Sequence, residues 1–298
     1  MVLEHLFPED WLEQRAGFAF ILGVVYSFVG ILLASVLFPS DPALVAVAFT
    51  SLLLLPEMYK LFSFEERKES LEQKVTWRSL WKDDIEIVRV YTFVFLGIIL
   101  VFSVGAILLP STETNGLFRE QLEIRFCDGD PNCDLGLTGQ AVSGSLFSGR
   151  LFYDLLSNNF LVLIACFIMA LLTGDGAIFL IVWNGSVWGT IFGITAKNAA
   201  AFSGGNPFAL FGIVMLIVFP HMILEGISYF LAAIAGSVIS KDVLLEKFAS
   251  DRFFSVFSFN LYLLIFALVV LVLGAGVEAF VLENVSIYGE IIRQSFLA

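Results

Sequence analysis

The residues best suited to chemistry in this chain are a histidine and a glutamate inside an otherwise apolar segment. His221 and Glu225 are four residues apart, so they share one face of a helix. They follow Pro220, which interrupts the helix that precedes it. Ionisable side chains at membrane depth are costly and usually face a bundle interior or a wet cavity. Glu278, near the end of the last apolar stretch, is a second intramembrane carboxylate that could join them.

Three interpretations of these ionisable side chains stay open. They could form a buried hydrogen-bonded pair that holds helices together, a proton or cation site, or a contact for a partner or lipid. One histidine and two carboxylates could also hold a divalent cation, but the sequence does not show that they meet, so any metal is unknown. No cofactor is expected. The polar side chains assigned to this intramembrane site are His221, Glu225, Glu278, Asn184 and Asn159.

The composition predicts a membrane protein. Of 298 residues, 58% are hydrophobic and only 15% are charged, and the mean hydropathy is +0.90. Several apolar runs reach the roughly 20 residues that cross about 30 Å of hydrocarbon, and their unbroken length excludes a transmembrane β-barrel. We therefore expect an all-α polytopic transmembrane bundle with about seven membrane segments, near residues 16–38, 42–62, 90–109, 151–172, 177–196, 208–239 and 254–280.

The sixth segment is too long for a simple crossing. Its roughly 32 residues would make a straight helix of about 48 Å at 1.5 Å per residue, which exceeds the bilayer core. We therefore expect one crossing that is broken or kinked at Pro220, with residues 208–219 either part of the span or a re-entrant piece.

The distribution of cations predicts the orientation. With the N-terminus in the cytoplasm, the inner connections hold about two thirds of the 16 lysines and arginines, as cytoplasmic loops of membrane proteins do. This orientation places the loop 110–150 outside the cell. The expected organisation is an interfacial helix and two spans in 1–62, a charged cytoplasmic helical linker in 63–89, a transmembrane domain in 90–282 and a tail in 283–298.

The cysteines differ in their surroundings. Cys127 and Cys133 bracket an acidic stretch of the loop 110–150, where a disulfide could persist on an oxidising side of the membrane. The alternating aspartates between them resemble the start of a calcium loop but lack its glycine and final glutamate, so a disulfide-closed acidic loop is favoured. Cys166 lies in an apolar span and is expected to pack as a small hydrophobe.

Small residues predict close helix packing. Gly185, Gly189 and Gly193 recur every fourth residue, which lets another helix approach closely, and Gly236 is assigned the same role. Asn184 lies beside the first of them.

The chain has no sign of an enzyme. It contains no Gly-x-Ser-x-Gly and no His-Glu-x-x-His motif. Asp154 and Asp175 are too far apart for a carboxylate dyad, about 31 Å along one helix. The net charge of −12 argues against a nucleic-acid partner, because phosphate binding needs clustered cations. The lipid bilayer is therefore the expected partner, with protein partners or a homo-oligomer left open.

Several short motifs stand in a specific order along the second part of the chain, between about residues 90 and 282. They are Asn158-Asn159, Gly174, Asn184-Gly185 with Gly189, Pro220-His221, Glu225, Ala232-Ala233 with Gly236, and Val277-Glu278-Ala-Phe. In this order the segment resembles the stage II sporulation protein M family. The two N-terminal spans and the Glu65-Glu66 stretch look like the extension of archaeal members.

The resemblance implies a limited function. In spore-forming bacteria, family members act with cell-wall-degrading partners during engulfment as a membrane scaffold, and that sporulation role should not be transferred to an archaeal member. We therefore expect a membrane scaffold or assembly factor. The rival is a proton- or cation-coupled transporter or channel that uses His221, Glu225 and Glu278, because transporters expose a midplane site in broken helices.

Overall fold

Apolar runs of membrane-crossing length all fold as helices in the computed structural model, which describes residues 16–71, 77–127, 149–245 and 250–297. Within these ranges the regular structure is entirely helical, and seven helices are long and apolar enough to cross a membrane. The predicted all-α polytopic bundle is confirmed. The seven spans are Gly17–Leu37, Pro42–Leu61, Asp84–Leu108, Gly149–Thr173, Ala177–Ser203, Pro207–Ser240 and Phe253–Asn284.

The helices are longer than the spans at several ends. The seven membrane helices are α2 (Ala16–Leu37), α3 (Pro42–Leu71), α4 (Trp77–Leu108), α7 (Gly149–Thr173), α8 (Ala177–Ser203), α9 (Pro207–Leu245) and α10 (Asp251–Asn284). Three short helices complete the described chain: α5 (Ser111–Leu117), α6 (Arg119–Cys127) and α11 (Ser286–Ser295). The predicted linker 63–89 is therefore built largely from the extended ends of α3 and α4.

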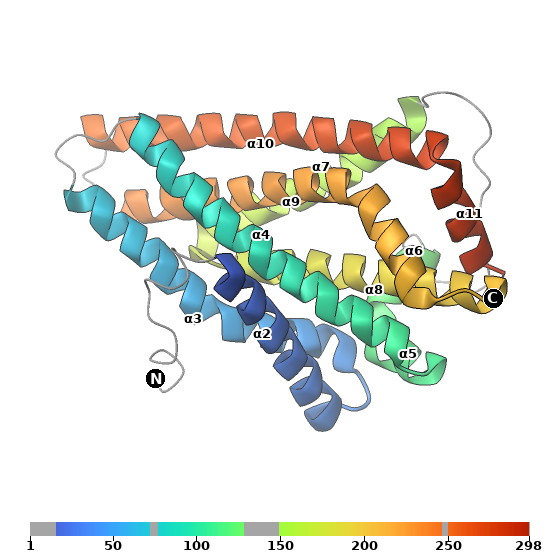
Figure 1. Cartoon of the computed structure of the whole chain (residues 1–298). Helices are drawn as coiled ribbons and strands as arrows, with labels where there is room; N and C mark the ends of the chain where they lie inside the picture. The colour runs from blue at the N-terminus through green and yellow to red at the C-terminus, as the bar shows by residue number, and fades with distance from the viewer. Residues whose placement is uncertain (1–15, 72–76, 128–148, 246–249, 298) are drawn as a thin grey trace.

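The long sixth segment is one continuous helix, α9, with Pro220 inside it. Figure 1 shows that α9 bends between its first, gold part and its later, orange part. A proline removes one backbone hydrogen bond and crowds the preceding turn, so we attribute the bend to it. The start of α9 is set by Asn206, whose side-chain oxygen accepts from the backbone N–H of Phe208 at 2.9 Å, with proline at the first helical position.

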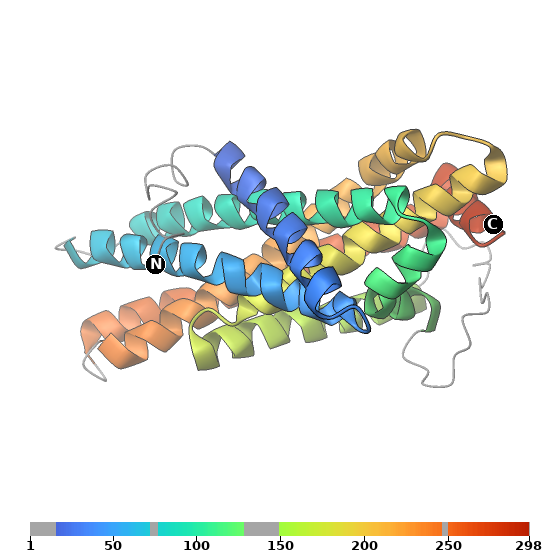
Figure 2. The same cartoon turned by 90° about the horizontal axis from the view of Figure 1, so that it is seen from below.

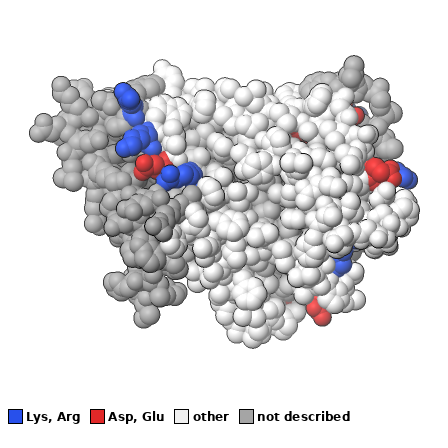
Figure 3. Space-filling view, in the orientation of Figure 1, with Lys and Arg blue, Asp and Glu red and all other residues white. Residues whose placement is uncertain are grey.

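The helices pack in two connected groups. The helix α9 lies between α10 and α7, and α4 lies against α8 and α2, while α8 also contacts α9 and so joins the groups (Figures 1 and 2). In the view of Figure 3, lysines, arginines, aspartates and glutamates gather near the two ends and leave a broad uncharged band between them. Such a band matches the hydrocarbon layer of a bilayer.

Glycines mark the closest helix approaches. Gly189 and Gly193 face α4 so closely that an added Cβ would lie 2.7 Å from the backbone oxygens of Ile99 and Ser103. Gly185 meets the side chains of Phe95 and Ile98 on the same helix. These three glycines therefore serve packing within one chain.

The start of the predicted external loop is folded back against the bundle. Phe118 is fully buried and packs on the ring of Phe102 in α4, with ring centroids 5.5 Å apart. Gln121 in α6 is 0% exposed, and its side-chain amide donates to the Ser186 hydroxyl at 3.3 Å. Ser186 is nine residues past Ala177, or about 14 Å into α8. Residues 111–122 are thus part of the packed protein.

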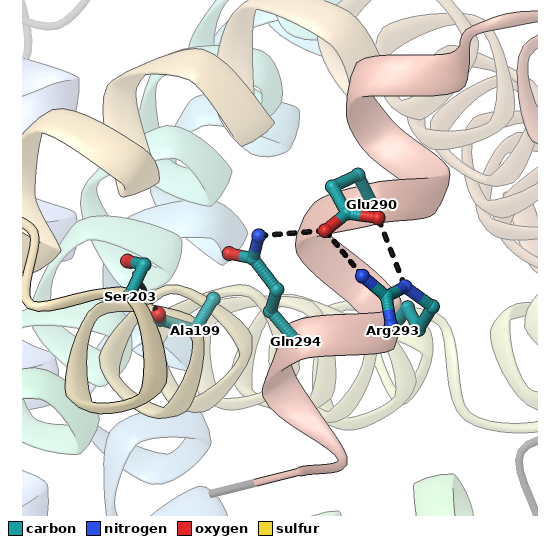
Figure 4. A network of polar contacts seen from close by, with 5 residues as sticks. All are labelled: Ala199, Ser203, Glu290, Arg293 and Gln294. Carbon is teal, nitrogen blue, oxygen red and sulfur yellow. Dashed lines mark hydrogen bonds and ion pairs between the residues drawn. The ribbon is translucent and has the colours of Figure 1, made fainter.

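The predicted tail contains the helix α11, which the sequence did not predict. Tyr288 and Ile291 are buried, and α11 packs on α8. Figure 4 shows a network beside the end of α8, in which Arg293 and Gln294 both donate to the Glu290 carboxylate, at 2.6 and 2.7 Å. The chain therefore ends in an ordered amphipathic helix.

Two sequence predictions fall outside the described residues. They are the interfacial helix within 1–15 and the disulfide between Cys127 and Cys133, because the acidic part of the loop that contains Cys133 is not described. Cys166 is a buried free cysteine.

Candidate functional site

Two glutamates from neighbouring helices meet inside the bundle. The carboxyl groups of Glu225 of α9 and Glu278 of α10 lie close enough to interact with each other. The approach is close because α10 has a glycine here: an added Cβ at Gly274 would lie 3.0 Å from Glu225 Cγ. Glu225 is 2% exposed. The sequence predicted that Glu278 was the side chain to look for beside Glu225, and the structure brings these two together.

Two buried acids that lie close together favour a shared proton. Carboxylate oxygens accept hydrogen bonds but donate none, so two carboxyl groups bond to each other only when one of them is protonated. Glu225 Oε1 and Glu278 Oε2 receive no hydrogen bond from a conventional donor among the described residues. Two negative charges this close would repel strongly in an apolar interior. We therefore expect the pair to hold one shared proton and at most one negative charge.

A buried tyrosine lies next to the pair on α9. Tyr229 follows Glu225 by one helical turn, is 1% exposed and interacts electrostatically with both glutamates. Its hydroxyl has no hydrogen-bond partner among the described residues. Tyr229 also interacts with Cys166 of α7, which is fully buried. The sequence analysis did not single out Tyr229, although its spacing from Glu225 places both on one helix face.

A second buried tyrosine and a buried aspartate lie near Cys166. Tyr91 of α4 interacts electrostatically with Cys166 and with Asp175, which is buried in the turn between α7 and α8. The Tyr91 ring stacks on Phe230, with centroids 5.5 Å apart. Asp175 was predicted as a turn residue, and Gly174 beside it has the left-handed φ of 81° that such a turn needs.

His221 does not belong to this group. It is buried, and its Nδ1 has no hydrogen-bond partner among the described residues. No hydrogen bond or ion pair is seen between His221 and either glutamate, and the interpretation of a His221–Glu225 lock stays a prediction. The described part of the chain holds no group of three His, Cys, Asp or Glu that could bind a metal ion. The suggested divalent site of one histidine and two carboxylates is therefore not assembled.

The two asparagines assigned to the site make no hydrogen bond to the glutamates in the described structure. Asn184 uses its side-chain amide within α8, donating to the carbonyl oxygen of Leu180 at 2.8 Å. Asn159 is buried on α7 and makes no hydrogen bond to the pair. The carboxyl pair with Tyr229 is therefore taken as the core of the site.

A further buried acid lies away from this site. Glu57 of α3 is 2% exposed, and its carboxylate lies 3.6 Å from the ammonium of Lys60. The spacing of these two residues on one helix could have revealed the pair from the sequence. An acid that is already paired with a cation is a weaker candidate for proton binding than two acids that face each other.

These features define a class of protein: a polytopic helical membrane protein with an intramembrane carboxyl pair. The family model for Stage II sporulation protein M matches residues 18–281, and the chain belongs to this family. The match includes α2 and α3, so it is wider than the segment 90–282 in which the motifs were recognised. Neither a curated protein nor a solved structure matches the chain.

Proposed function

We propose that this protein is an integral-membrane scaffold or assembly factor. One observation supports the proposal: the two glutamates that could have formed an open ion site lie against each other between α9 and α10, with Glu225 almost fully buried. A shared proton satisfies both acids and fixes the two helices side by side. In this use the pair holds the bundle together and leaves the outer faces for partners.

The outer faces of the bundle are available for such partners or for lipid. Large side chains such as Tyr153, Leu216 and Tyr262 are 68%, 79% and 57% exposed. Glycine contacts are used within the chain, as Gly189 and Gly193 show, so partners would meet bulky apolar faces. Such faces contact lipid in a bilayer and are also where other membrane helices pack by shape.

Photo-crosslinking in the membrane tests the scaffold proposal. A photoreactive side chain at Tyr153 or Leu216 is expected to capture one defined polypeptide, either a partner or a second copy of this chain. The control is the same label at Ala232, which is fully buried and should capture only this chain itself. If the exposed positions yield adducts with lipid alone, the scaffold proposal is wrong.

A second function, proton-coupled transport, is favoured by the proton that the carboxyl pair holds. An intramembrane acid that can gain and lose a proton is typical of pumps and transporters. The reconstituted protein would then move an ion or small solute under a gradient, and Glu225→Gln would abolish the movement while the fold stays intact. If no gradient drives movement of any ion or small solute, transport is excluded.

The membrane orientation and the lack of enzymatic activity are part of the same proposal. We propose a cytoplasmic N-terminus, an external loop 110–150, an archaeal type of family member, a disulfide between Cys127 and Cys133, and no enzymatic activity. Labelling of single cysteines from either side of the membrane tests the orientation. Modification of a cysteine at Ser286 by an impermeant reagent from the cytoplasm would contradict it.

A further inference from the structure

The helix α7 has one face that the rest of the described chain leaves uncovered. Only 22% of the most apolar window of this span is buried. On that face Leu161, Ile168 and Leu172 are 68%, 45% and 73% exposed. Asn158 is exposed on the same helix. This face therefore meets either lipid or another polypeptide.

The spacing along this face is that of a coiled-coil seam. Asn158, Leu161, Ala165, Ile168 and Leu172 follow one another at alternating intervals of three and four residues. An alternation of three and four keeps side chains in one stripe that faces a partner helix, and membrane helices commonly pair with the same left-handed geometry. The small Ala165 in the middle of the stripe permits a close approach. These five residues are called the α7 seam.

The polar member of the seam lies at membrane depth. The span Gly149–Thr173 has 25 residues, or about 37 Å at 1.5 Å per residue. Asn158 is nine residues after Gly149, or about 14 Å along the helix, which places it within the roughly 30 Å hydrocarbon layer.

The Asn158 amide differs from other asparagine amides of the bundle. Asn184 and Asn284 donate to carbonyl oxygens of their own helices, at 2.8 and 2.9 Å. No hydrogen bond of the Asn158 side chain is seen among the described residues. Lipid tails cannot supply one, so a polar side chain that faces outward at this depth needs a partner from another helix.

A second copy of the chain supplies that partner. An asparagine amide both donates and accepts, so it is complementary to another asparagine amide. Copies in one membrane share their orientation, so a two-fold axis along the membrane normal places two parallel α7 helices with the same residues face to face. In parallel coiled coils one asparagine in the seam fixes the register and the number of chains. We propose that two copies of this protein pair through the α7 seam, with their Asn158 amides hydrogen-bonded to each other.

The charges at the end of the seam are compatible with this pairing. Asp154 precedes Asn158 by four residues and extends the stripe toward the end of the span. Its carboxylate lies 3.9 Å from the guanidinium of Arg150 on the same helix, and both side chains are largely exposed. Each copy therefore brings its own cation to this level, and the seam does not press two unpaired carboxylates together.

This inference goes beyond the scaffold proposal, because a transporter could pair through the same face. The α7 seam concerns only the contact between two copies. Other outer faces, such as the one that contains Leu216, stay available for a different polypeptide.

Photo-crosslinking of the full-length protein in lipid vesicles tests the pairing. A photoreactive side chain at Leu161 is expected to give an adduct of two copies, attached within α7 of the second copy. The protein is diluted in lipid until capture is incomplete, so that a change in affinity changes the yield. Asn158→Leu should then lower the yield at least about threefold, because one hydrogen bond between membrane helices typically contributes that much or more to an equilibrium. Asn158→Leu should fold, because the side chain that it replaces is exposed.

Two controls make the test specific. The same label at Phe160, which is 42% exposed but lies on another side of α7, should not give the adduct of two copies. Asn284→Leu removes an amide that is bonded within α10 and should leave the yield from Leu161 unchanged. The proposal is overturned if the adduct is absent, is equally strong from Phe160, or is unaffected by Asn158→Leu. Capture of a different polypeptide at Leu161 would also overturn it, while the scaffold proposal would stand.

Discussion

The contact between α9 and α7 can be tested at a single glycine. An added Cβ at Gly236 would clash with the carbonyl oxygen of Phe167 and lie 2.9 Å from Ala170 Cβ, a distance that real Cβ atoms essentially never reach. The clashing atom belongs to the backbone of α7, so it cannot rotate away as a side chain would. The substitution Gly236→Ala must therefore push the two helices apart.

The size of the effect follows from comparison with a matched position on the same helix. Gly212 in α9 has nothing within 4 Å of an added Cβ. Replacing a helical glycine by alanine favours the helix by roughly 0.5–1 kcal/mol, and this gain is common to Gly212→Ala and Gly236→Ala. The difference between the two variants is then the cost of overpacking, about 1–3 kcal/mol, or about 5–150-fold in the folding equilibrium.

Reversible unfolding of both variants in the same mixed micelles measures this difference. We expect Gly212→Ala to be as stable as the parent protein or slightly more so, and Gly236→Ala to be clearly less stable. Equal stability of the two variants would show that α7 and α9 do not approach as closely as the structure indicates.

Three other perturbations have defined outcomes. Glu225→Gln keeps a donor for Glu278 and should leave the Tm near that of the parent. Glu225→Ala leaves a buried acid without a partner and should cost about 1–3 kcal/mol of stability. Thermal unfolding measures both variants, and equal losses of stability would argue against the interaction between the two glutamates. Partial burial and then the neighbouring acid Asp41 raise the pKa of Glu120, so its contribution to the packing of α6 is present at low pH and is lost as the pH rises through the raised pKa. Amide exchange in α6, corrected for its intrinsic pH dependence, should therefore be slower at pH 5 than at pH 8, and Glu120→Gln should remove this difference. Gln121→Glu places a charge inside the bundle, where the Gln121 amide now donates to the Ser186 hydroxyl. Protease cleavage near α6 should therefore be faster in Gln121→Glu than in the control Gln121→Leu. Identical cleavage of the two variants would place this residue in solvent.

Much of the fold could be predicted because a bilayer allows only a few kinds of backbone structure. A chain must satisfy its backbone hydrogen bonds inside hydrocarbon, so long apolar runs become helices of predictable length. The seven predicted segments agree with the seven spans, with the larger shifts at the start of α4 and the end of α8, where helices extend into more polar sequence. Pro220 was predicted to disturb α9, and the structure adds that the helix continues through it.

The packing of α6 could not be predicted, because its local sequence is polar and is typical of a solvent-exposed helix. Gln121 is buried only because α8 offers a hydroxyl from Ser186 at the right place. That hydroxyl lies 65 residues further along the chain, and only the tertiary fold shows that the two meet.

The candidate site was predicted in part. The cost of burying charge correctly pointed to Glu225 and Glu278, but spacing shows which residues share a helix face and not which side chain of the next helix they meet. His221 shares a face with Glu225 and still lies apart from the pair. Tyr229 was not singled out, because only the tertiary fold places it near Glu278 on the next helix.

The shared proton of the Glu225–Glu278 pair is the central claim, and infrared spectroscopy at neutral pH tests it most directly. We expect a protonated carboxyl band in the protein in lipid that disappears in both Glu225→Gln and Glu278→Gln and persists in Glu290→Gln, whose carboxylate is exposed and bonded to Arg293. Absence of that band at neutral pH, or its persistence in both intramembrane variants, would show that the two glutamates do not share a proton.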